Sequence, residues 1–191
     1  EDPMGRAASV KEEIEFALAH EAEASTLVDL QASGQLPTRV THNDTKLNNV
    51  MLDATTREPL CVMDLDTVMP GLSAYDFGDS IRFGAATAAE DEKDLNKVTM
   101  SLNLFRVYTA GYLKACPALT DKEIAMLPVG AKMMTREVGV RFLTDYLSGD
   151  TYFRTHYEGQ NLDRCRTQFK LVSDMEAQWE QMHEIVQQLT K

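Results

Sequence analysis

The sequence predicts a mainly α (α+β) protein, in which a helical body carries one small β-hairpin. Two observations predict this fold class. From about Asp76 to the end of the chain, apolar residues recur at helical spacing and no further run is typical of a strand. Only the segment from Arg39 to Met63 contains short apolar runs separated by a polar turn. Strands are therefore expected in this one region, which follows an N-terminal helix.

The first expected element is a single helix from about Val10 to Gln31. Gly34 and Pro37 follow it and are expected to end it, because neither residue continues a helix well. Five apolar residues of this segment fall on one helical face: Val10, Ile14, Ala17, Leu18 and Val28.

The expected hairpin joins residues 50–52 to residues 60–63 through a polar turn at residues 53–59. Asn49 stands just before the first run and Asp64 just after the second. Pairing of the two runs would bring Asn49 and Asp64 to the same end of the hairpin, where two oxygen ligands can share one hard cation. The following residues, Met69 to Ala74, are expected to form a loop.

The remaining chain is expected to form a series of helices. Thr120 and Glu123 match a capping box at a helix start, Pro128 is expected to break or restart the next helix, and Gly149 to end it. The last segment places six apolar residues on one broad face: Phe169, Val172, Met175, Trp179, Met182 and Val186. Such a stripe is typical of a core.

Composition narrows the classes of partner. A chain of 191 residues fits one domain that can bury its own core, and its net charge of −11 would repel a nucleic-acid backbone or an anionic membrane surface. No apolar run approaches the length of a membrane span, and the acidic start is unlike a signal peptide, so a cytoplasmic location is expected. The three cysteines, Cys61, Cys116 and Cys165, lack metal or redox spacing and are expected to be reduced core thiols.

The stretch from Thr41 to Asn49 contains the pattern H-x-D-x-K-x-x-N, which is close to the catalytic loop of kinases. Phosphoryl transfer needs a group that accepts or orients the proton of the attacking hydroxyl, and Asp44 is the candidate. Lys46 would stabilise the negative charge of the moving phosphoryl group. Asn49 and Asp64 are candidate ligands of a Mg²⁺ ion held against nucleotide phosphates.

Three neighbouring residues are candidates for supporting roles. His42 is expected to hold the loop by packing and hydrogen bonding. Asp66 can be a second metal ligand or a carboxylate behind the first ligands. Asp76, like Asp79, reads most simply as a carboxylate at a helix N-terminus, and the functional alternative for Asp76 is an anchor for the backbone of the motif loop.

The sequence resembles the carboxy-terminal lobe of the phosphotransferase enzyme family that includes aminoglycoside phosphotransferases and choline kinases, and within it the bacterial N-acetylhexosamine 1-kinases. The resemblance is carried by RVTHNDTKLNNVMLD, CVMDLDTVMPGLSAYDFGDSIRFGA and VRFLTDYLSGDTYF. It implies a protein-kinase-like lobe in which Asp44 is the catalytic base and Asn49 and Asp64 bind Mg²⁺ with ATP. It also implies that the anomeric hydroxyl of an N-acetylhexosamine is the acceptor, with three residues near the sugar: Arg141, Tyr152 and Trp179.

The resemblance also implies that part of such an enzyme lies outside this chain. Complete members have an amino-terminal lobe with a phosphate-covering loop and a Lys that grips the nucleotide phosphates. No Gly-rich phosphate loop occurs in this sequence. We therefore expect residues 1–191 to be the carboxy-terminal lobe alone, to be inactive as given, and to need the missing amino-terminal lobe as a partner beside the sugar and ATP.

Two other interpretations remain open from the sequence. The run from Val62 to Val68 also resembles the D-x-D-x-[TV] signature of haloacid-dehalogenase-type phosphatases, with Asp64 as nucleophile and Asp66 as general acid and base. That fold needs a parallel sheet with several strand and helix units. The other is a pseudokinase-like binding module, although clustered carboxylates without a function would cost stability by mutual repulsion.

Overall fold

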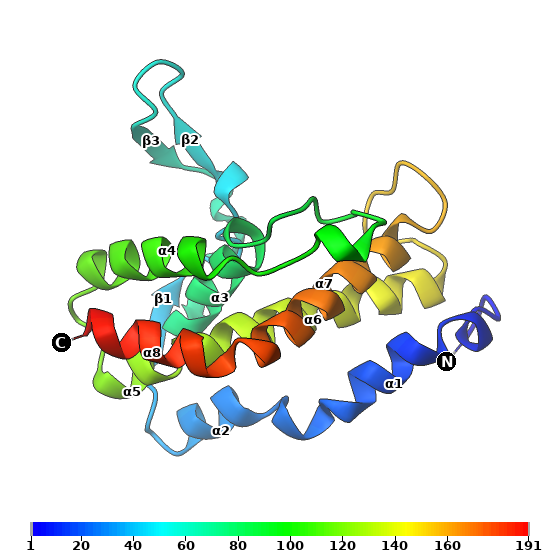
Figure 1. The fold of residues 1–191 in the computed structure, drawn as a ribbon, viewed down its shortest axis with the longest axis horizontal. Helices are drawn as coiled ribbons and strands as arrows, with labels where there is room; N and C mark the ends of the chain where they lie inside the picture. The colour runs from blue at the N-terminus through cyan, green and yellow to red at the C-terminus, as the bar shows by residue number, and fades with distance from the viewer. Residues whose placement is uncertain (1, 191) are drawn as a thin grey trace.

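The computed structural model describes residues 2–190 and has the predicted mainly helical body with a projecting hairpin (Figure 1). The long helices α6 (Leu127–Ser148) and α7 (Gln160–Ala177) lie side by side in the middle of the molecule. Three further helices pack around them: α3 (Ser73–Gly84), α4 (Leu102–Ala115) and α8 (Trp179–Leu189). The short α5 (Asp121–Ala125) precedes α6. Within residues 2–190, no helix is both long enough and apolar enough to cross a bilayer.

The largest apolar core lies among α3, α4, α6, α7 and α8. Phe77 of α3 packs with Phe105 of α4, with ring centroids 5.9 Å apart, and both side chains are fully buried. A second core cluster joins α6 and α7 to the N-terminal segment through Val10, Phe142 and Phe169. Burial of such side chains supplies most of the free energy that holds the helices together.

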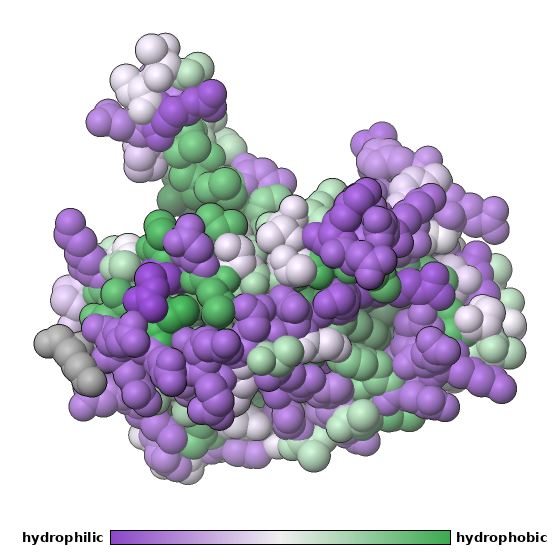
Figure 2. Space-filling view, in the orientation of Figure 1, coloured by the Kyte–Doolittle hydropathy of each residue, from purple (hydrophilic) through white to green (hydrophobic). Residues whose placement is uncertain are grey.

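The strands form two separate two-stranded antiparallel sheets. β2 (Val50–Leu52) pairs with β3 (Pro59–Val62), with Val50 opposite Val62, so the predicted hairpin is confirmed. β1 (Arg39–Thr41) pairs with β4 (Met69–Gly71), with Thr41 opposite Met69. The stem of the hairpin presents apolar side chains to solvent and its tip is polar (Figure 2).

These sheets bear on the phosphatase alternative. Every strand pair in residues 2–190 is antiparallel, and the strand that precedes Asp64 is the second strand of an isolated hairpin. The parallel sheet that a haloacid-dehalogenase-type fold needs is not present in this part of the chain.

Several expected helix features are confirmed. Thr120 and Glu123 form a reciprocal capping box at the start of α5, with Thr120 Oγ1 accepting from Glu123 N at 3.2 Å. Pro128 lies in the first turn of α6, where its missing N–H costs nothing, so the helix restarts there. Gly149 ends α6 in the left-handed conformation at φ 102°.

The expected single helix over residues 10–31 is wrong. The segment forms α1 (Lys11–Ala19) and α2 (Thr26–Ala32), joined by a 3-10 turn at Glu21–Glu23. Arg136 of α6 donates to the carbonyl oxygen of His20 at the end of α1, and the backbone N–H of Glu23 donates to the same oxygen at 3.2 Å within the 3-10 turn. The break separates Val28 from the face of α1, and Val28 is exposed; Leu18, which lies on α1 itself, is exposed as well.

Two further expectations are wrong. Residues 69–74 are not a loop, because Met69–Gly71 pairs with β1 and α3 already begins at Ser73. Cys61 is exposed on β3 and Cys116 is half-buried, so only Cys165 is a buried core thiol. Cys61 lies on β3, all four residues of which are exposed, so the short apolar run in the sequence does not mark a buried strand.

Close contact between two helix backbones positions α3 against α6. A Cβ atom at Gly78 of α3 would overlap the carbonyl oxygen of Gly130 in α6, and a Cβ atom at Gly130 would overlap the carbonyl oxygen of Ala74. Glycine is therefore required at both positions for this approach.

Candidate active site

The motif loop between β1 and β2 is held by the first turns of α3. The Asp76 carboxylate accepts hydrogen bonds from the backbone N–H groups of His42 at 2.9 Å and Asn43 at 2.8 Å. Asp79 accepts one from the N–H of Thr45 at 2.7 Å, and Thr45 Oγ1 donates to the Asp76 carbonyl oxygen at 2.6 Å. Hydrogen bonds to a charged acceptor are stronger than neutral ones, so these contacts fix the backbone on both sides of Asp44.

His42 ties the motif loop to the end of the hairpin. Its Nδ1 accepts from the backbone N–H of Asp44 at 3.3 Å, so the proton lies on Nε2, which donates to the carbonyl oxygen of Met63 at 3.0 Å. Thr67 Oγ1 donates to the His42 carbonyl oxygen at 2.6 Å. These bonds leave His42 with structural contacts on both ring nitrogens.

Asp44, Lys46 and Asn49 lie together. The Asn49 side-chain amide donates to Asp44 Oδ2 at 2.8 Å and to the Asp44 carbonyl oxygen at 2.9 Å. Lys46 Nζ is 3.6 Å from the other carboxylate oxygen, Oδ1. The Asp44 carboxylate therefore has a fixed orientation, remains 27% exposed, and can accept a proton from a group in front of it.

The hairpin brings Asp64 next to Asn49 along the backbone. Met63 N–H donates to the Asn49 carbonyl oxygen at 2.8 Å, and Asp64 follows in the left-handed conformation at φ 57°. Asp64 and Asp66 are both exposed. No three His, Cys, Asp or Glu side chains within residues 2–190 cluster closely enough to hold a metal ion. A magnesium site here would combine the carboxylate of Asp64 with the amide oxygen of Asn49, which are hard oxygen donors of the kind Mg²⁺ prefers.

A cavity of about 440 Å³ opens beside Asp44 and Lys46. Its opposite wall comes from α6 and from the loop that follows α6, and includes Arg141 and Tyr152. Arg141 Nη2 donates to the Tyr152 hydroxyl at 3.2 Å, and the guanidinium carbon lies 5.5 Å from the centre of the Tyr152 ring. The structure therefore brings four of the sequence-predicted site residues around one cavity: Asp44, Lys46, Arg141 and Tyr152.

Trp179 lies elsewhere. It lines a separate hollow with Lys132 and Arg136, and the Lys132 ammonium is 4.9 Å from the centre of its ring. Trp179 is half-buried at the start of α8 and is not part of the cavity wall beside Asp44.

Sequence reasoning missed a buried ion-pair chain in the cavity wall. Arg82 is only 5% exposed, and its Nε and Nη2 donate to Asp79 Oδ1 at 3.0 and 2.8 Å. Its Nη1 donates to Glu90 at 2.6 Å. Burial alone would lower the pKa of Arg82, but the two carboxylates outweigh it and raise the pKa above its usual value. The one sequence signal was the three-residue spacing of Asp79 and Arg82 on a helix.

Glu137 on α6 faces the same cavity, 3.7 Å from Arg141. Partial desolvation of this carboxyl, whose side chain is 46% exposed, raises its pKa, and the nearby Arg141 only partly offsets that effect.

One family model matches this chain. It is that of the phosphotransferase enzyme family, and it matches residues 3–99, just over half of the chain. The matched part contains the motif loop, the hairpin and α3 with both of its anchoring carboxylates. The chain therefore belongs to the phosphotransferase enzyme family.

Proposed function

We propose that this protein is an ATP-dependent kinase that phosphorylates a hydroxyl group of a small molecule, most specifically the anomeric hydroxyl of N-acetylglucosamine or N-acetylgalactosamine. The observation that carries the proposal is the Asp44 carboxylate, which is oriented by Asn49 and Lys46 and opens onto a cavity of small-molecule size.

Asp44 is proposed to accept the proton of the acceptor hydroxyl. A base positioned in this way contributes roughly 10² to 10⁴ in rate. Lys46, 3.6 Å from the same carboxylate, would stabilise negative charge on the phosphoryl group. The hydrogen bonds from the motif-loop backbone to Asp76 and Asp79 support this role, because a rigid loop holds the base in one geometry.

Asn49 and Asp64 would hold Mg²⁺, with Asp66 as a further ligand or as a carboxylate behind the first ligands. The ion would bridge the nucleotide phosphates and neutralise their charge. The pairing of Met63 with Asn49 supports this assignment, because it puts the two proposed ligands at one end of the hairpin.

Arg141 and Tyr152 are proposed to contact the acceptor. They share a hydrogen bond and lie across the cavity from Asp44, so a sugar between them would have polar contacts and an aromatic edge. The proposal for an N-acetylhexosamine rests on the resemblance carried by the motif blocks. Trp179, placed in a separate hollow, has no support from the cavity for a sugar contact.

Residues 1–191 are proposed to act as the carboxy-terminal lobe, with an amino-terminal lobe completing the nucleotide site. The assays of this proposal therefore require the full-length encoded protein. Its transfer activity would be measured with labelled ATP and a panel of free sugars, amino alcohols and aminoglycosides. Phosphate on carbon 1 of an N-acetylated hexose is the expected result, and transfer only to amines or cholines would overturn the acceptor assignment.

The decisive variant is Asp44→Asn. Loss of the proton acceptor should reduce turnover by at least about 10²-fold while ATP binding changes little. Asp29→Asn is the matched control, because Asp29 is exposed on α2, far along the chain from the motif. Wild-type turnover in the Asp44 variant would show that Asp44 is not the base, and ATP binding without turnover in the wild-type protein would favour the pseudokinase-like alternative.

A further inference from the structure

Five cationic side chains line the cavity beside Asp44, and four of them have a carboxylate partner. The pairs are Lys46 with Asp44 at 3.6 Å, Arg82 with Asp79 at 2.8 Å, Arg141 with Glu137 at 3.7 Å and Arg164 with Glu90 at 3.8 Å. The fifth is Arg154. Its guanidinium has no carboxylate within ion-pair distance and no hydrogen-bond acceptor among residues 2–190, in a protein with net charge −11.

The backbone that carries Arg154 is fixed. Asp145, a buried residue of α6, accepts hydrogen bonds from the N–H groups of three successive loop residues, Thr151 at 2.9 Å, Tyr152 at 2.8 Å and Phe153 at 2.9 Å. Arg164 Nη1 then donates to the Arg154 carbonyl oxygen at 3.2 Å. The loop therefore presents the exposed Arg154 side chain from a fixed backbone, so that only the side chain itself has to be ordered when it binds a ligand.

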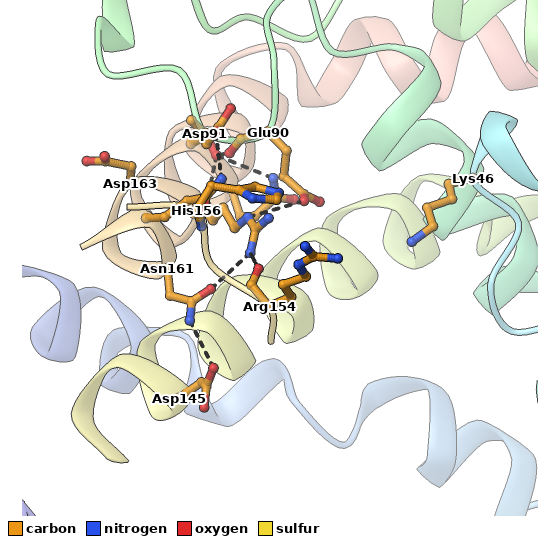
Figure 3. Close-up of polar contacts among 12 residues, drawn as sticks. Lys46, Glu90, Asp91, Asp145, Arg154, His156, Asn161 and Asp163 are labelled. Carbon is orange, nitrogen blue, oxygen red and sulfur yellow. Dashed lines mark hydrogen bonds and ion pairs between the residues drawn. The ribbon is translucent and has the colours of Figure 1, made fainter. Parts of the chain in front are cut away.

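A series of polar contacts that begins at Arg164 connects the backbone of Arg154 to the motif loop. Arg164 approaches Glu90, Glu90 accepts from Arg82, and Arg82 donates to Asp79, which accepts from the N–H of Thr45 beside Asp44. In Figure 3, Arg154 extends from its loop on the side that faces Lys46, with Glu90 and Asn161 in the polar cluster behind it. Arg154 and Lys46 thus contribute positive charge to the cavity from opposite walls.

We propose that Arg154 binds the phosphoryl group as it reaches the acceptor and then the phosphate of the product, together with Lys46. A neutral sugar needs no unpaired guanidinium, whereas a planar guanidinium fits two phosphate oxygens. The inference rests on the proposed function, since it names a further contact in the same site.

Arg154 makes and breaks no covalent bond in this step. The acceptor oxygen forms a bond to the γ-phosphorus while the bond from that phosphorus to the bridging oxygen of ATP breaks, and the electron pair leaves with ADP. The acceptor proton passes to the Asp44 carboxylate. Arg154 would stabilise the three equatorial oxygens of the transferring group, whose negative charge must be met by fixed positive groups.

The test compares two ligands that differ by the phosphate alone. N-acetylglucosamine and N-acetylglucosamine 1-phosphate are titrated by calorimetry into full-length wild-type protein and the Arg154→Gln variant. The dissociation constant of the phosphate ester should rise about tenfold or more in the variant, while that of the neutral sugar stays within about twofold. Arg154→Lys should recover part of the loss, because it restores the charge without the planar fork.

The matched control is Arg106→Gln, which removes the same charge from an exposed position on α4 outside the cavity. It should leave both dissociation constants unchanged. Equal weakening of both ligands by Arg154→Gln would mean that Arg154 only supports the loop, and an unchanged ester constant would mean that it does not bind phosphate. Either result overturns the inference.

Failure of the acceptor assignment gives a different pattern. If neither N-acetylglucosamine nor N-acetylgalactosamine binds or is phosphorylated, the same variants are titrated with inorganic phosphate. This ligand carries the recognised group without a sugar. Weaker binding of inorganic phosphate to Arg154→Gln than to the wild-type protein supports the inference even then, and equal binding overturns it.

Discussion

Ionisation of Glu123 makes the stability of the elements around the motif loop depend on pH. This carboxylate is 2% exposed, and it accepts hydrogen bonds from Arg39 Nε at 2.9 Å and Nη2 at 2.7 Å, from Ser73 Oγ at 2.9 Å and from Thr120 N–H at 2.8 Å. Arg39 lies on β1 just before the motif loop, and Ser73 begins α3, which anchors that loop. One side chain of α5 therefore connects β1 and α3, the two elements next to the motif loop.

Burial by itself would raise the pKa of Glu123, but the donors, led by Arg39, outweigh it and lower the pKa from 4.5 to about 2. At 1.36 kcal/mol per pKa unit, this shift corresponds to about 3 kcal/mol of stability at neutral pH. Because folding lowers the pKa, the unfolded chain takes up the proton first as the pH falls. The contribution is therefore complete well above pH 4.5 and is lost as the pH approaches 2.

The measurement is urea denaturation of the wild-type protein and the Glu123→Gln variant at pH 7 and pH 3.5. The difference between their free energies of unfolding should shrink by roughly 1 to 1.5 kcal/mol over that interval. Glu184→Gln is the control, because Glu184 is exposed on α8, and its difference from the wild-type protein should not change with pH. An equal gap between wild-type and Glu123→Gln at both pH values would refute the assignment of a lowered pKa to Glu123.

Two other substitutions test the contact between α3 and α6 and the anchoring of the motif loop. Gly130→Ala would push a Cβ atom into the Ala74 carbonyl oxygen and should lower the free energy of unfolding by about 1 to 3 kcal/mol, measured by thermal and urea denaturation. Gly111→Ala on α4 meets no atom within 4 Å and should stabilise by up to about 1 kcal/mol, so equal effects of the two changes would contradict the close helix contact. Asp76→Ala removes the two carboxylate oxygens that accept from the N–H groups of His42 and Asn43. It should lower the free energy of unfolding by about 2 to 4 kcal/mol and speed hydrogen exchange at these two N–H groups. Unchanged exchange there would show that Asp76 does not anchor the loop.

The parts of the fold that follow from local chemistry could be predicted from the sequence. The hairpin was visible because two short apolar runs flank a polar turn, in which Asp53 Oδ1 accepts from the N–H groups of Thr55 and Thr56. The capping box at Thr120 and the helix restart at Pro128 have equally local causes.

The errors come from contacts between distant residues. The residues around His20 are good helix formers, yet the helix ends there, where Arg136 of α6 takes the His20 carbonyl oxygen. β4 exists because Met69 to Gly71 lies beside β1, and its own sequence, with a central proline, has no strand pattern.

The candidate site divides in the same way. The spacing of Asp44, Lys46 and Asn49 is local, so their proximity could be anticipated from the motif. The ion pairs from Arg82 through Glu90 to Arg164 join α3, a loop and α7, and no spacing in the sequence predicts them.

The close contact between the backbones of α3 and α6 at Gly78 and Gly130 sets the width of the cavity. α3 holds the loop that bears the proposed base, while α6 bears Arg141 and leads into the segment with Tyr152 and Arg154. Because neither glycine has a side chain, the two backbones are in direct contact at this crossing. This contact fixes the distance between the helices that carry the opposing cavity walls. A methyl group at either glycine would overlap backbone atoms of the other helix, so a replacement that still folds must separate α3 from α6 and thereby change the distance between the two cavity walls.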